Sequence, residues 1–157
     1  MIESQELTES HIASLRNLST EVEHVVRSED FERLVKEHRW TTSYGHCSVA
    51  ACAMQVLSWV VYGVYLDTYS ASFQTNVSFS HWFVCDPTEA MKLDPTKYQF
   101  EDRENGSHEL DTFYGVAVRR GHPSRRQDAP YYTNSPPVRH IIDVVSSRLG
   151  LTDKGSG

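Results

Sequence analysis

The spacing of apolar residues predicts helices in the first part of the chain. Between residues 6 and 27, apolar side chains recur at three- and four-residue steps, as on one face of a helix: Ile12, Leu15, Leu18, Val22 and Val25. Ser28 can cap a second helix that ends near residue 38. Residues 48–61 are apolar nearly all round, which predicts a buried third helix that ends at Gly63.

The middle of the chain changes to patterns typical of strands. Four segments rich in β-branched and aromatic residues are expected to form a sheet: 64–73, 77–86, 92–100 and 113–119. Residues 101–111 predict a polar loop between the last two strands. Residues 120–137 contain Pro, Arg, Tyr and Asn without a clear period and predict a long loop. Helical spacing returns in residues 138–149, with Gly150 as the stop.

Helices followed by a run of strands predict an α+β fold with an antiparallel sheet. The length of 157 residues suits one domain, expected over residues 1–153, with residues 1–39 as its helical N-terminal part. Residues 154–157, Lys-Gly-Ser-Gly, have the composition of an added tail and are left out of the predicted domain.

Charge and composition narrow the classes of partner. The formal net charge of -6 argues against a surface that binds nucleic acid or an anionic membrane, since both need positive charge. No apolar run approaches the roughly 20 residues of a membrane span, and the N-terminus lacks the pattern of a signal peptide. Three cysteines, an odd number, suit free thiols in a reducing compartment. A cytoplasmic protein is the expectation.

Cys47 is the candidate nucleophile because of its place at the start of the apolar helix. It follows Gly45 in a turn-forming stretch. Free backbone N–H groups and the positive end of the helix dipole stabilise a thiolate at such a position. The alternative is that Cys47 is a small buried residue, as most free cysteines are.

His81 and Asp94 are the candidate base and its orienting residue. Strand alternation places His81 on one face with Phe83, and Trp82 on the other. If residues 86–89 form a two-residue hairpin loop, His81 and Asp94 lie directly opposite each other, near enough for the carboxylate to accept a ring N–H. A longer loop would move the partner of His81 along the strand.

These short motifs resemble the papain-like superfamily of cysteine enzymes, in particular transglutaminase-like, NlpC-type and YunG-type proteins. The resemblance covers about residues 40–100 and depends on three phrases: Gly45-His46-Cys47, Ser80-His81-Trp82 and Asp94-Pro95-Thr96-x-x-Gln99-Phe100. It implies a papain-like fold in which Cys47, His81 and Asp94 are the catalytic residues.

The chemistry implied by this resemblance is acyl transfer without a metal or another cofactor. The Cys47 thiolate attacks an amide or thioester carbonyl of a protein or peptide, and water or an amine releases the acyl group. Water gives a peptidase, amidase or deamidase, and an amine gives a transferase. Trp40 and Trp82 are candidate substrate-binding residues.

Two other functions stay open at this point. A zinc site could draw on His46, Cys47, Cys52, His81 and Cys85, but the pairs Cys47–Cys52 on a helix and His81–Cys85 on a strand are badly spaced for chelation. A catalytically inactive papain-fold module could instead bind a protein or nucleic-acid partner. For nucleic acid or phosphate, the predicted contacts are basic and aromatic residues near the long loop: Arg119, Arg120, Arg125, Arg126, Tyr131 and Tyr132.

Overall fold

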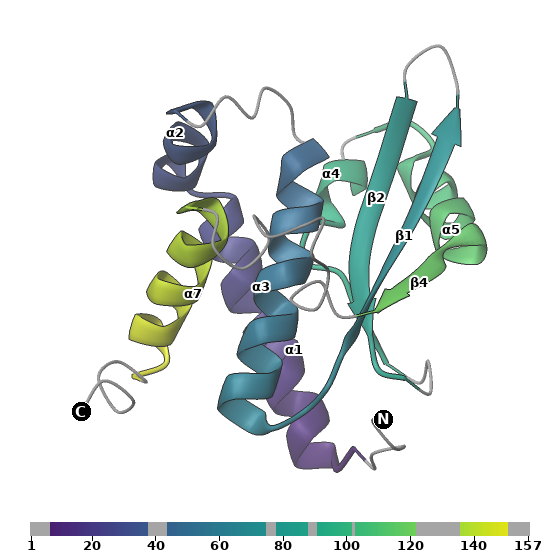
Figure 1. Cartoon of the computed structure of the whole chain (residues 1–157). Helices are drawn as coiled ribbons and strands as arrows, with labels where there is room; N and C mark the ends of the chain where they lie inside the picture. The colour runs from purple at the N-terminus through teal and green to yellow at the C-terminus, as the bar shows by residue number, and fades with distance from the viewer. Residues whose placement is uncertain are drawn as a thin grey trace.

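The fold is α+β: in the described part of the chain, six helices pack on a four-stranded antiparallel sheet (Figure 1). A computed structural model describes residues 7–37, 44–74, 78–87, 91–101, 103–121 and 136–150. The α+β class predicted from the order of elements is confirmed.

Four helices form the layer on one side of the sheet: α1 (Glu9–Val26), α2 (Glu29–Glu37), α3 (Tyr44–Tyr62) and α7 (Pro136–Arg148). The Thr8 hydroxyl caps α1 by accepting from the backbone N–H of His11, at 3.0 Å. The Ser28 hydroxyl accepts from the Phe31 N–H at 3.2 Å and so caps α2, as expected. The described start of α3, Tyr44, lies four residues before the predicted one, so Cys47 belongs to the helix itself.

The sheet has the strand order β3-β2-β1-β4. Its strands are β1 (Asp67–Gln74), β2 (Ser78–Cys85), β3 (Lys92–Leu93) and β4 (Val118–Gly121). The long hairpin of β1 and β2 is the centre of the sheet, and its register pairs Ala71 with His81.

The prediction for residues 92–119 is wrong in three places. The strand expected over 92–100 stops at Leu93, because Pro95 has no N–H to give to a ladder and the Asp94 side chain accepts from the Thr96 N–H in a local turn. Two helices follow, α4 (Tyr98–Glu101) and α5 (Gly106–Val116), in place of the expected loop and of most of the strand over 113–119.

The predicted long loop is also too long at both ends. Arg120 and Gly121 belong to β4, and Pro136 and Pro137 open α7. The rest of that prediction, residues 122–135, lies outside the described residues.

Apolar residues cover both faces of the sheet. On one face Val84 joins the main core cluster, which includes Leu18 of α1, Met54 of α3 and Ile141 of α7. On the other face Phe83 and Cys85 pack with Tyr69, and Ala71 packs with Phe100 and Phe113. The predicted alternation along β2 is therefore confirmed, and His81 belongs to the face that α4 and α5 cover.

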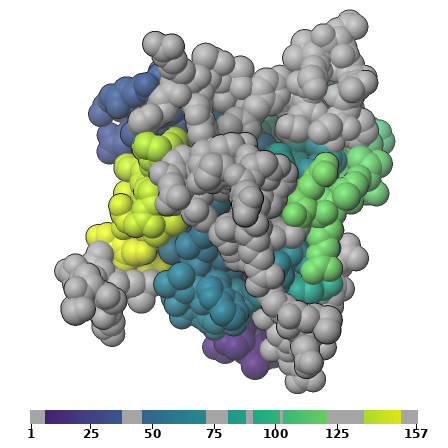
Figure 2. All heavy atoms as spheres, viewed as in Figure 1, coloured from purple at the N-terminus to yellow at the C-terminus, as the bar shows by residue number. Residues whose placement is uncertain are grey.

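The C-terminal end of α3 reaches the surface on the side shown in Figure 2. Trp59 and Val60, in its last turn, are exposed, whereas the rest of α3 is largely buried. None of the helices in the described part of the chain is long and apolar enough to span a lipid bilayer.

Candidate active site

Cys47 lies in the first turn described for α3 and is buried, with 1% of its surface exposed. Its helix packs along β2, so the start of α3 lies beside the strand that carries His81. A hydrogen bond joins the Cys47 side chain to His81. The structure thus brings the predicted nucleophile to the predicted base.

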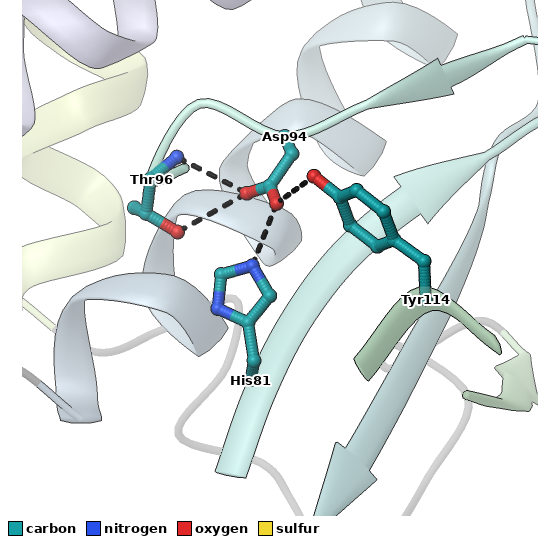
Figure 3. Close-up of polar contacts among 4 residues, drawn as sticks. All are labelled: His81, Asp94, Thr96 and Tyr114. Carbon is teal, nitrogen blue, oxygen red and sulfur yellow. Dashed lines mark hydrogen bonds and ion pairs between the residues drawn. The ribbon is translucent and has the colours of Figure 1, made fainter. Parts of the chain in front are cut away.

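His81 is the centre of the group. Its Nε2 donates to Asp94 Oδ2 over 2.6 Å, and both side chains are buried (Figure 3). Because Nε2 contacts Asp94, the ring nitrogen left for the hydrogen bond to Cys47 is Nδ1. His81 therefore links the thiol and the carboxylate in one chain of three side chains.

Asp94 reaches His81 by a different route from the predicted one. The observed pairs are Val84 with Leu93 and Cys85 with Lys92, so the same register extended by one residue places Asp94 beside Phe83. The expected two-residue loop is wrong, and the Asp86 N–H instead bonds to the Met91 carbonyl at 3.2 Å. The observed register differs from the predicted one by two residues. Asp94 therefore stays on the same face of the sheet as His81 and is its diagonal neighbour.

Two further residues hold Asp94 in place (Figure 3). The Tyr114 hydroxyl, from α5, donates to Oδ2 over 2.6 Å. The backbone N–H and the hydroxyl of Thr96 donate to Oδ1, each over 3.3 Å. With His81, these donors use both oxygens of a buried carboxylate, as a buried charge requires.

The surroundings favour the protonated form of His81. Burial alone lowers its pKa, but the hydrogen bonds to Asp94 and Cys47, and the charges of both groups, raise the pKa from 6.5 to about 9. Burial, and then the nearby charge of Asp94 and the hydrogen bond to it, raise the pKa of Tyr114, which therefore keeps its proton and donates. At neutral pH the geometry suits an imidazolium between two acceptors.

Aromatic rings enclose the imidazole on the remaining sides. The ring of Phe100 meets it edge-on with centroids 4.9 Å apart, and the ring of Phe113 lies at 6.0 Å. Phe83, two residues along β2, stacks at 6.4 Å. These apolar contacts lower the local dielectric and strengthen the polar contacts of His81.

The two tryptophans expected to bind substrate are not brought to this group. Trp40 lies outside the described residues. Trp82 packs against the main core cluster on the opposite face of the sheet from His81, as the alternation of β2 requires.

The other candidate ligands for zinc are engaged elsewhere. Burial raises the pKa of Cys52 to about 12, so this thiol stays protonated, and Cys85 packs with Tyr69 and Phe83. His46 Nε2 lies 3.0 Å from Glu32 Oε1. Within the described ranges, no three His, Cys, Asp or Glu side chains are grouped to hold a metal ion.

Two of the arginines considered for nucleic-acid binding make contacts within the sheet. Arg119 forms an ion pair with the buried Asp67, and Arg120 Nε donates to Ser70 Oγ over 2.7 Å. Arg125 and Arg126, with Tyr131 and Tyr132, lie outside the described residues.

Tyr114 is the member of the site that sequence reasoning missed. It fell in a segment expected to be a strand, whereas Leu110, Phe113, Tyr114 and Ala117 have the three- and four-residue spacing of a helix face. That spacing predicts that Phe113 and Tyr114 face inward.

Comparison with family models, with curated proteins and with solved structures found no match for this chain. The interpretation of the site therefore depends on its own geometry.

Proposed function

We propose that the protein is a papain-like cysteine enzyme that catalyses acyl transfer, with Cys47 as nucleophile, His81 as general base and Asp94 as the residue that orients the histidine. The observation that carries this proposal is the placement of His81, which is hydrogen-bonded to both Asp94 and Cys47. A nucleophile, a base and an orienting group in that order are the parts that acyl transfer needs.

The reaction follows from these contacts. In the attacking form the proton of Cys47 resides on His81, and the sulfur attacks the carbonyl carbon of an amide or thioester and forms a C–S bond. The bond from that carbon to the leaving nitrogen or sulfur breaks, and His81 gives the leaving group its proton. Water, deprotonated by His81, then releases the acid, or an amine takes the acyl group.

We propose a protein or peptide as the acyl donor. A peptidase would produce a new amino terminus, and a deamidase would release ammonia from a glutamine or asparagine side chain. A candidate protein substrate separates the two by these products.

The experiment uses an activated ester, p-nitrophenyl acetate, because it acylates a reactive thiolate without a specific binding site. We expect a burst of p-nitrophenolate equal to the enzyme concentration, with the acetyl group found on Cys47 by mass spectrometry. Cys47→Ala and His81→Ala should lose the burst. Cys52→Ala is the matched control, since it removes a thiol from the same helix and should keep the burst.

The burial of the group favours a second candidate, an inactive module that binds a partner. Cys47 and His81 are each 1% exposed, so the same contacts could serve as a polar part of the core. The rate of Cys47 alkylation by iodoacetamide against pH separates the two, because burial alone slows alkylation and raises the midpoint, whereas a thiolate–imidazolium pair lowers the midpoint. A midpoint well below the ~8.5 of a free thiol that is lost in His81→Ala supports the enzyme. A histidine-independent midpoint supports the module.

A further inference from the structure

A cavity of about 310 Å³ lies next to the candidate triad and reaches Asp94 and Tyr114, but Cys47 and His81 do not line it. Its other walls come from α1, from β3 and from the turn that follows β3. Pockets that bind small molecules begin at about this size.

Three positively charged side chains line this cavity: Arg16, Lys92 and Lys97. Among the residues that the structure describes, no ion pair or hydrogen bond engages the side chain of Arg16 or of Lys97. Lys92 Nζ lies 3.7 Å from the centroid of the Tyr114 ring, which places its charge at the cavity wall. This cluster of positive charge contrasts with the formal net charge of the chain, which is -6.

The negative charges in the same walls already have partners. Glu23 forms an ion pair with Arg27 at 3.1 Å. Asp94 accepts from His81, Tyr114 and Thr96. The three cations are therefore not neutralised by the carboxylates that line the cavity with them. Ser19 and Thr20 add hydroxyl groups to the α1 wall.

We infer that this cavity binds a small polyanion, a molecule with two or more phosphate or carboxylate groups, through Arg16, Lys92 and Lys97. The volume exceeds what a single small ion would fill, and the cations come from separate elements, so two anionic groups can be held at once. The cavity shares Asp94 and Tyr114 with the proposed acyl-transfer site, but binding there does not require that site to be active.

The test is calorimetric titration of the full chain with pyrophosphate and with citrate, at constant ionic strength. We expect saturable binding of at least one probe, and the tighter one identifies a phosphorylated or a polycarboxylate ligand. The double variant Arg16→Gln/Lys97→Gln should weaken binding by roughly tenfold or more. Both side chains are exposed, so thermal unfolding should show that the variant still folds.

Arg33→Gln/Lys36→Gln is the matched control. It removes the same two charges from another surface hollow, of about 320 Å³, where Arg33 pairs with Asp30 at 3.4 Å. Binding should be unchanged in this variant. The inference is overturned if neither probe binds saturably, if acetate binds as tightly as citrate, or if both double variants lose the same affinity.

Calorimetry measures polyanion binding by the cavity, and the ester burst measures the reactivity of Cys47. Loss of the ester burst with intact pyrophosphate or citrate binding would overturn the proposed enzyme alone. A normal burst without polyanion binding would overturn the cavity site alone.

Discussion

At the scale of single residues, the candidate site depends on how a buried histidine keeps a proton. Burial of an imidazolium is costly, and His81 offsets that cost with one acceptor on each nitrogen, Asp94 and Cys47. Asp94 in turn is fixed by Tyr114 and Thr96. His81 is therefore protonated in the folded state before any substrate binds.

This arrangement predicts that stability depends on pH through His81. Its pKa is about 9 in the folded state against the ordinary value of 6.5, so protonated His81 stabilises the folded state. The contribution, about 3 kcal/mol, is fully present below pH 6.5 and is lost as the pH rises through about 9. We expect the gap in the free energy of unfolding between Cys47→Ala and Cys47→Ala/His81→Gln to shrink over this window, since the Cys47→Ala background removes the titration of the thiol and leaves that of His81. Urea unfolding at a series of pH values measures the gap.

The control for this prediction is direct titration of the His81 ring protons by NMR. A midpoint near 6.5, together with a gap in stability that is constant with pH, would contradict the prediction and would mean that His81 is neutral at physiological pH.

At the scale of elements, α4 and α5 hold the apolar side of the site. Phe100 of α4 and Phe113 of α5 contact the His81 ring, and their own rings lie 5.7 Å apart. The two helices approach closely at Gly106, where an added Cβ would lie 1.7 Å from the Phe100 carbonyl oxygen. Only glycine allows this approach.

Gly106→Ala should therefore separate α5 from α4 and loosen the contacts around His81. We expect a loss of stability at or above the ~1–3 kcal/mol typical of overpacking, together with slower alkylation of Cys47 relative to Cys52 in the folded protein. Chemical denaturation and mass spectrometry of the alkylated protein measure the two effects.

Gly115→Ala is the matched control within the same helix. An added Cβ at Gly115 meets nothing within 4 Å, and alanine is favoured over glycine in a helix by about 1 kcal/mol. This variant should be more stable than the native protein. Equal effects of the two alanines would show that the contact between Gly106 and Phe100 does not hold the helices together.

The elements also show which parts of the fold a sequence can predict. Helices with a regular apolar face, such as α1 and α7, were predicted to within a few residues, because one spacing sets both the structure and the burial. The register of β3 was not predicted correctly. The loop before β3 sets this register, and no short motif gives the length of that loop. The contact between His81 and Asp94 was still predicted, since a register error of two residues leaves a side chain on the same face of the sheet.

At the scale of the whole molecule, the site forms where three separate parts of the chain meet. Cys47 comes from the helical layer, His81 and Asp94 come from β2 and from the turn after β3, and Tyr114 comes from the helix on the other face. Local patterns could suggest the first three, but the contact of Tyr114 with Asp94 spans 20 residues and follows only from the packing.

The core that supports this junction runs from α7 through α3 to the sheet, which predicts that the molecule unfolds as one unit. Ile141 of α7 is fully buried in the cluster that also contains Met54 of α3 and Val84 of β2. Ile141→Ala should cost about 2–5 kcal/mol through the cavity that it leaves. Because the cluster is continuous, circular dichroism and tryptophan fluorescence should report the same lowered midpoint. Ile142→Ala, at a half-buried neighbouring position, should cost less. If the two probes gave different midpoints, α7 would unfold separately from the sheet, and the single domain predicted for residues 1–153 would be wrong.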